Sequence, residues 1–156
     1  MTANAVTLFA LFLSITTGVV LMQYEGIWFV LPIVLFVRMA LNAIDGMLAK
    51  EHNMKTPLGA LLNELSDVVS DAFLYMPFAW VVGFHPMNIA VIVMLSIVTE
   101  MTGVLGVQIG ASRRYDGPCG KSDRAFVFGL IALLLAFDVP MTVAGVYVEW
   151  GLMVVL

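Results

Sequence analysis

Hydrophobic residues fill six long runs of the chain, and short polar stretches rich in turn residues separate these runs. The runs cover residues 6–22, 27–48, 58–82, 89–110, 124–137 and 141–156. Most of them approach the ~20 residues that an α-helix needs to cross a bilayer, although the last two are short. The pattern predicts an all-α integral membrane protein with six transmembrane helices in one domain over residues 1–156. Pro32 and Pro77 fall inside runs, and we expect each to kink its helix.

Composition supports the membrane assignment. Hydrophobic residues make up 62% of the chain and charged residues only 12%, about half the charged share of soluble domains. The single cysteine, Cys119, excludes an intrachain disulfide and a four-thiolate zinc site. No basic patch with interleaved aromatic residues is present, so nucleic acid is not an expected partner. The chain begins directly at the first run and ends within the last, which raises the expectation that flanking segments are missing.

Basic residues gather in or beside two of the five connections between the runs, at 49–57 and 111–123. The connections after the first, third and fifth runs carry no Lys or Arg. Because Lys and Arg favour cytoplasmic loops, both basic connections and both termini are predicted to lie in the cytoplasm. We therefore expect a multi-pass protein of a bacterial inner membrane, surrounded by membrane lipid.

Carboxylate and amide side chains recur at helical spacing in the second and third runs. The second run carries Arg38, Asn42 and Asp45 on one face, and the third carries Asn63, Asp67 and Ser70 on one face with Asp71 beside them. A carboxylate inside a span costs roughly 3 kcal/mol, so such a cluster is usually functional. Oxygen ligands from two helices suit Mg²⁺ or Mn²⁺. The pattern predicts a metal site between these helices near their cytoplasmic ends.

Other interpretations stay open from the residues alone. A lone aspartate in a span could serve as an ion-pair partner, for example of Arg38. Glu64 could pair with a basic residue or face another helix, and Glu100 is similarly ambiguous. Ion and proton transporters also use intramembrane carboxylates, but they need polar residues through the full depth of the membrane. The polar residues here gather in the cytoplasmic halves of two runs, which disfavours a transporter.

The segment from Asn42 to Asp67 resembles the signature of the CDP-alcohol phosphotransferase (CDP-alcohol phosphatidyltransferase) family. That signature reads Asp-x2-Asp-Gly-x2-Ala-Arg-x8-Gly-x3-Asp-x3-Asp, and the segment matches its spacing throughout. Three letters differ, because Asn42 and Asn63 replace Asp and Lys50 replaces Arg. The layout of six hydrophobic runs also agrees, so the resemblance covers nearly the whole chain.

The resemblance implies transfer of a phosphatidyl group from a CDP-activated lipid to a small alcohol, with release of CMP, in phospholipid biosynthesis. It implies one or two Mg²⁺ or Mn²⁺ ions that hold the diphosphate of the donor, and Asp67 as the base that takes the alcohol proton. The implied metal-site residues are Asp45, Asp67, Asn42 and Asn63, and Asp71 joins them by its position. The implied CDP-binding residues are Asn4, Thr7, Gly46, Ala49, Lys50 and Gly59.

Basic residues before the fifth run are candidates for binding a phosphorylated acceptor. Lys121 and Arg124 would lie one helical turn apart, and Arg113 precedes them. In some relatives, basic residues at this place bind such an acceptor, while the alternative is contact with anionic lipid headgroups. Relatives are often homodimers, so a homodimer is a further expectation.

The replaced aspartates leave a second function open. Each Asn in place of Asp removes one negative charge, which weakens the attraction for a second cation. A homologue that binds CDP-lipid or a divalent cation without turnover is therefore the alternative to an active enzyme. The retained Asp67 favours the enzyme.

Overall fold

The computed structural model describes residues 2–24, 26–51, 56–110 and 120–156. Within these residues the chain forms six α-helices and one 3₁₀ helix and no strand, which confirms the all-α prediction. The elements are α1 (Ala3–Gln23), α2 (Val30–Glu51), α3 (Pro57–Tyr75), η1 (Met76–Trp80), α4 (Pro86–Gln108), α5 (Lys121–Ala136) and α6 (Ala144–Val155). Each of the six hydrophobic runs overlaps one α-helix.

Local sequence signals explain several helix ends. Thr56 caps α3, because its hydroxyl accepts a hydrogen bond from the Gly59 N–H at 2.9 Å, and Pro57 follows as the first helical residue. Pro77 ends the α-helical part of the third run, which continues beyond Tyr75 as η1. Pro32 lies in the first turn of α2, where a proline costs no helical hydrogen bond, so its position gives no reason for a kink.

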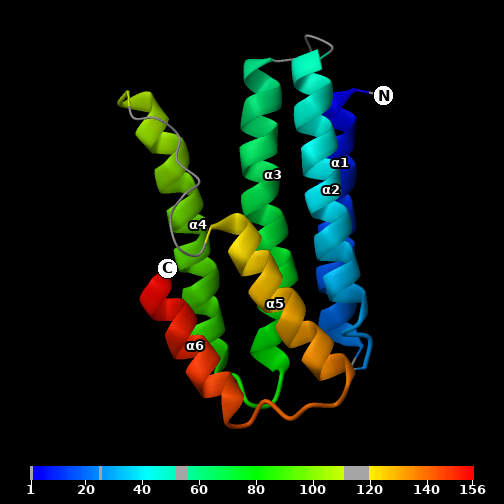
Figure 1. Cartoon of the computed structure of the whole chain (residues 1–156), viewed down its shortest axis with the longest axis vertical. Helices are drawn as coiled ribbons and strands as arrows, with labels where there is room; N and C mark the ends of the chain where they lie inside the picture. The colour runs from blue at the N-terminus through cyan, green and yellow to red at the C-terminus, as the bar shows by residue number, and fades with distance from the viewer. Residues whose placement is uncertain (1, 25, 52–55, 111–119) are drawn as a thin grey trace.

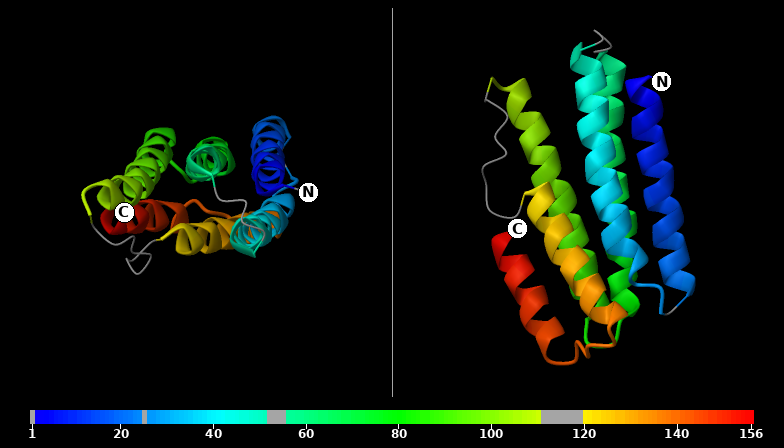
Figure 2. Two further views of the ribbon diagram at one scale, coloured as in Figure 1. Left: turned by 90° about the horizontal axis from the view of Figure 1, so that it is seen from above. Right: turned by 45° about the vertical axis from the view of Figure 1, so that its right-hand side comes forward.

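The helices form two rows of three. Seen from above, α1, α3 and α4 lie in one row, and α2, α5 and α6 lie in the other (Figures 1 and 2). Contacts join α1 to α3 and α2, and α5 packs against α2. This arrangement brings α1, α2 and α3 together at the end of the molecule where α2 finishes and α3 starts.

Large apolar side chains lie both in the core and on the outer surface. Leu31, Leu74 and Ile92 have no exposed surface, and the ring of Tyr75 stacks on Phe128 with centroids 4.0 Å apart. Many other apolar residues face outward, with Ile109 for example 88% exposed. Water-soluble monomers rarely expose such extensive apolar surface, whereas lipid accepts it.

Three of the described helices are long and apolar enough to cross a membrane. They are Ala3–Gln23, Val30–Glu51 and Pro86–Val107. The α5 and α6 helices have 16 and 12 residues, fewer than the ~20 of an ordinary span. Six membrane crossings therefore stay a prediction.

A buried carboxylate attaches α6 to the start of α4. Glu149 is 1% exposed. Its oxygens accept hydrogen bonds from the backbone N–H of His85 at 2.5 Å and from Asn88 Nδ2 at 2.9 Å. His85 is the N-terminal cap residue of α4, so Glu149 satisfies a donor that the helix itself leaves unpaired.

Gly18 sets the distance between α1 and α3. A Cβ at this position would collide with the backbone carbonyl of Phe73 on α3. A backbone group cannot turn aside as a flexible side chain can, so the two helices would have to separate. Small residues allow this kind of close helix packing in membranes.

We expect Gly18→Ala to lower the free energy of unfolding in detergent by about 1–3 kcal/mol, because the added methyl group overpacks the α1–α3 contact. The matched control is Gly103→Ala on α4, where an added Cβ meets no atom within 4 Å. The control should be neutral or stabilising, since Ala favours helix over Gly. Thermal unfolding followed by circular dichroism measures both changes, and equal stability of the two variants would contradict the prediction.

Candidate functional site

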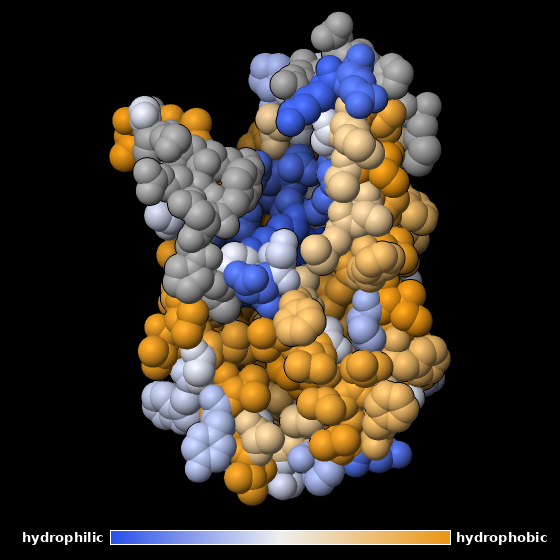
Figure 3. Space-filling view, in the orientation of Figure 1, coloured by the Kyte–Doolittle hydropathy of each residue, from blue (hydrophilic) through white to orange (hydrophobic). Residues whose placement is uncertain are grey.

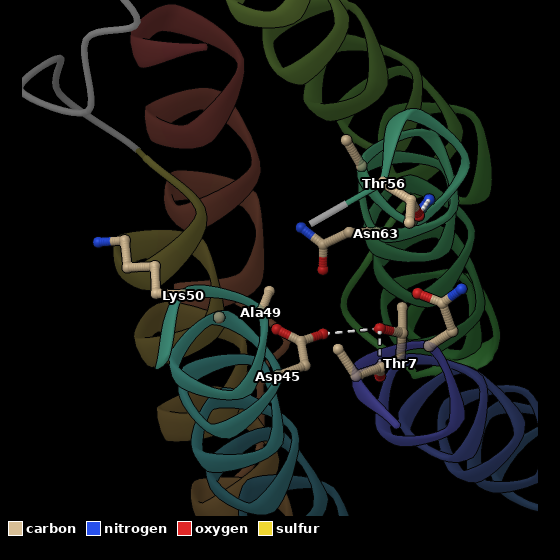
Figure 4. Close-up of a pocket in the computed structure, with 11 residues that line it drawn as sticks. Thr7, Asp45, Ala49, Lys50, Thr56 and Asn63 are labelled. Carbon is tan, nitrogen blue, oxygen red and sulfur yellow. Dashed lines mark hydrogen bonds between the residues drawn. The ribbon is translucent and has the colours of Figure 1, made fainter. Parts of the chain in front are cut away.

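A cavity of about 410 Å³ opens between α1, α2 and α3. The residues that line it are Ala3, Asn4, Thr7, Asp45, Gly46, Ala49, Lys50, Thr56, Gly59, Ala60 and Asn63. The structure thus brings together all six residues predicted to bind CDP, along with two of the predicted metal ligands (Figure 4). On the face drawn in Figure 3, hydrophilic residues gather in a hollow toward the top of the molecule, with apolar residues over much of the lower part.

Sequence reasoning missed Thr56, Ala3 and Ala60 as lining residues. Thr56 stands directly before Pro57, and Thr-Pro followed by an apolar stretch is a helix-start signal that could have placed its hydroxyl beside Gly59. The two alanines carry no chemical signal of their own, and only the packing of the helices places them at the cavity wall.

Thr7 holds Asp45 in place across the α1–α2 contact. The Thr7 hydroxyl donates a hydrogen bond to Asp45 Oδ2 at 2.7 Å, and both residues are buried (Figure 4). A hydrogen bond to a carboxylate is stronger than one between neutral groups, so it restricts the Asp45 side chain. Lys50 lies one turn further along α2, and its ammonium extends away from Asp45 and Thr7.

Two glycines leave room around the cavity. A Cβ at Gly59 would lie 2.8 Å from Asn4 Oδ1, so the absence of a side chain lets the Asn4 amide approach α3. A Cβ at Gly46 would meet no atom within 4 Å. The space beside the Gly46 backbone is therefore part of the opening between the helices.

Asp67 is held through one of its two carboxylate oxygens. Asn42 Nδ2 donates to Oδ1 at 2.9 Å, and Arg38 Nη2 donates to the same oxygen at 3.2 Å. The Lys121 ammonium, at the start of α5, forms an ion pair with this oxygen too. No described residue donates a hydrogen bond to Oδ2. The second oxygen therefore stays available to accept a proton or to bind a cation.

Both oxygens of Asp71 are engaged by arginines. Arg38 Nη1 pairs with Oδ1, and Arg124 Nη2 pairs with Oδ2 at 3.2 Å. Arg124 also pairs with Glu100 Oε2 at 3.0 Å, which resolves the ambiguity about Glu100 in favour of an ion-pair partner. The alternative of an ion pair with Arg38 thus holds for Asp71, and a metal-ligand role of Asp71 stays a prediction.

The residues predicted to bind an acceptor have different surroundings in the structure. Lys121 is partly exposed and its ammonium reaches Asp67. Arg124 is 1% exposed and enclosed between Asp71 and Glu100, so its contact with an acceptor stays a prediction. Arg113 lies outside the described residues.

Asp45 and Asn63 are the residues that would hold a divalent cation on the cavity side. Among the described residues, no group of three or more His, Cys, Asp or Glu side chains is placed to hold a metal ion. The side-chain oxygens of Asp45 and Asn63 at the cavity belong to a carboxylate and an amide, and oxygens of this kind suit a hard cation. Asn63 Oδ1 is buried without a hydrogen-bond partner in the described part of the chain, and it points toward Asp45 (Figure 4). A buried oxygen without a donor is costly unless a ligand satisfies it.

Comparison with known proteins gives two matches. A family model described as CDP-alcohol phosphatidyltransferase matches residues 1–155. The inner membrane protein YnbA of Escherichia coli (strain K12) is 50% identical over 137 residues, which are 86% of this chain and 68% of that protein. No solved structure gives a significant match.

The buried pairs of Asp71 predict a large loss of stability when its charge is removed. Asp71→Asn leaves Arg38 and Arg124 without their shared carboxylate, and removing one partner of a buried ion pair costs about 3–5 kcal/mol. The matched control is Asp138→Asn, because Asp138 is exposed and its φ of 56° suits Asn equally well. Chemical unfolding in detergent micelles compares the two, and an Asp71→Asn protein as stable as the control would disprove the structural role.

Proposed function

Because the chain belongs to the CDP-alcohol phosphatidyltransferase family, we propose that it moves a phosphatidyl or similar substituted phosphate group from a CDP-activated lipid to a small alcohol. The reaction releases CMP and belongs to phospholipid biosynthesis. The observation that carries the proposal is the cavity between α1, α2 and α3, which gathers the six CDP-binding candidates around Asp45 and Asn63. Its volume of about 410 Å³ lies within the usual range of small-molecule sites.

The nucleotide half of the donor occupies this cavity. Asn4 and Thr7 border it from α1, and Gly46 leaves room for a phosphate or ribose against the α2 backbone. Asp45 and Asn63 would supply oxygens for a Mg²⁺ or Mn²⁺ ion at the diphosphate. When bound, such an ion neutralises the charge that accumulates in phosphoryl transfer.

Asp67 serves as the base. Its Oδ2 accepts the proton of the acceptor hydroxyl while the alcohol oxygen forms a bond to the lipid-side phosphorus. The bond from that phosphorus to the bridging oxygen breaks, and its electron pair leaves with CMP. The three donors on Oδ1 keep the carboxylate oriented, so that Oδ2 faces the acceptor. An alcohol has a high pKa, so a positioned base accelerates its attack.

The acceptor approaches from the side of α5. Lys121 is the candidate for contact with a phosphorylated acceptor, because its ammonium already stands beside Asp67. We place the site at the cytoplasmic side of an inner membrane. Lys50 and Lys121 belong to the two connections that are rich in basic residues, and such connections favour the cytoplasm. All six helices cross or enter the bilayer, with the short α5 and α6 accommodated by local thinning of the bilayer. We also propose that membrane lipid surrounds the helices and that the chain forms a homodimer.

The decisive experiment is acceptor-dependent CMP release from CDP-diacylglycerol with Mg²⁺ or Mn²⁺, using a panel of alcohols and alcohol phosphates. We expect Asp67→Asn to lose about 100-fold or more in rate, because loss of a general base typically costs this much. Asp138→Asn, far from the site on an exposed turn, is the control and should keep full activity.

Two negative outcomes have different meanings. CDP-lipid binding without release of CMP for any acceptor would replace the enzyme with the non-catalytic binding protein that Asn42 and Asn63 favour. If the protein shows neither CDP-lipid binding nor CMP release, the CDP-activated donor is excluded from the proposal.

The open space at Gly46 predicts that a larger residue there weakens ligand binding without lowering the stability of the fold. We expect Gly46→Ala to weaken CDP-lipid binding about tenfold, because a methyl group intrudes on a site filled by ligand. The same change should not destabilise the helix, since Ala is the better helix former. Gly151→Ala on α6 is the matched control, with open space around the added Cβ and no part in the cavity. Isothermal titration and thermal unfolding measure the two effects, and unchanged affinity in Gly46→Ala would contradict the assignment of the cavity.

A further inference from the structure

The amide of Asn42 lacks the negative charge of an aspartate, and it also makes a contact that an aspartate could not make. Its Nδ2 donates a hydrogen bond to Asp67 Oδ1 at 2.9 Å, across the α2–α3 contact. An aspartate at position 42 could not donate this bond and would instead set a second carboxylate against Asp67. Two such carboxylates repel each other unless a cation lies between them. The asparagine therefore suits a site in which no ion occupies that place.

Two cations of the chain occupy the surroundings of the same oxygen. The Lys121 ammonium and the Arg38 guanidinium both pair with Asp67 Oδ1. The side chains of Lys121 and Asp67 are only 24% and 10% exposed, so water screens their attraction less than at an open surface. Asp67 is therefore compensated by two cations of the chain.

Among the described residues, the ion pairs beneath the site join carboxylates and cations in equal number. The three carboxylates belong to Asp67, Asp71 and Glu100, and the three cations to Arg38, Lys121 and Arg124. Of the two aspartates of the motif, Asp67 belongs to these pairs, whereas Asp45 accepts its hydrogen bond from the neutral Thr7. Within the described part of the chain, the motif aspartate that these ion pairs leave uncompensated is therefore Asp45, beside the buried Asn63 oxygen.

We propose that the Lys121 ammonium replaces a second divalent cation, so that this site binds one metal ion, on the Asp45–Asn63 side, and meets the diphosphate with Lys121 on the other. The inference rests on the proposed function, because it concerns the same diphosphate site. An ammonium is a compact charge with three donors, so it can contact Asp67 and a phosphate oxygen together. The Lys121 contact reaches the site from α5, outside the segment that carries the motif.

The test counts Mn²⁺ ions per chain in the purified protein with CDP present, by electron paramagnetic resonance. We expect one ion in the wild type. Restoring the two aspartates and removing the lysine, in Asn42→Asp/Asn63→Asp/Lys121→Met, should give two ions whose spectra broaden through mutual coupling. Ser122→Ala is the matched control, because Ser122 is the exposed next residue of the same helical turn, and it should keep one ion.

A second measurement isolates the charge of Lys121. Lys121→Met should weaken CDP binding about tenfold or more at saturating Mn²⁺, which corresponds to the loss of one hydrogen bond to a charged group. Lys121→Arg keeps the charge and should retain most of the affinity. Circular dichroism confirms that each variant is folded, so a loss confined to Lys121→Met reports the missing charge.

The outcomes separate the inference from the proposed function. Two ions in the wild type, or one ion in both the wild type and the triple variant, would overturn the role of Lys121 while leaving CMP release untouched. No bound ion in any variant would also overturn it. One ion in the wild type and two in the triple variant, without CMP release in the wild type, would support the inference and overturn the enzymatic proposal.

Discussion

The pairing of Asp71 with two arginines is the contact on which the arrangement of the helices depends. A charge inside an apolar bundle is stable only when a partner of opposite sign and hydrogen bonds replace its hydration. Asp71 on α3 meets Arg38 from α2 and Arg124 from α5, and Arg124 meets Glu100 from α4. Four helices are thereby joined at one place, where most other contacts between them are apolar and adaptable.

The same cluster orients the candidate base. Arg38 contacts Asp71 with one nitrogen and reaches Asp67 with the other, through both its side-chain oxygen and its backbone carbonyl. A displacement of α2 against α3 would therefore disturb the stability of the bundle and the direction of Asp67 Oδ2 together. Structural support and site geometry share one arginine, which makes the orientation of Asp67 as rigid as the fold.

The division of charge gives the site two unlike halves. On the cavity side, Asp45 and the Asn63 oxygen lie beside open space, and no ion pair joins Asp45 to a cation among the described residues. On the α5 side, Asp67 is already compensated by protein groups. A diphosphate that bridges these halves would meet a bound ion at one end and an ammonium at the other. Asn42 makes this asymmetry possible, because its amide can donate where a carboxylate would repel.

The sequence by itself determined the helices and the faces on which the motif residues lie, since hydropathy period and residue spacing are local properties that α-helical geometry converts into shared faces. It also placed Asp45, Gly46 and Asn63 on the facing sides of α2 and α3. Only the tertiary structure decided that both oxygens of Asp71 are paired, whereas Asp67 is paired through Oδ1 and keeps Oδ2 available. Asp67 and Asp71 are one turn apart on α3 and look alike in the sequence, and their roles separate because Arg124 and Lys121 arrive from α5. Such choices depend on packing between distant segments, which no local pattern encodes.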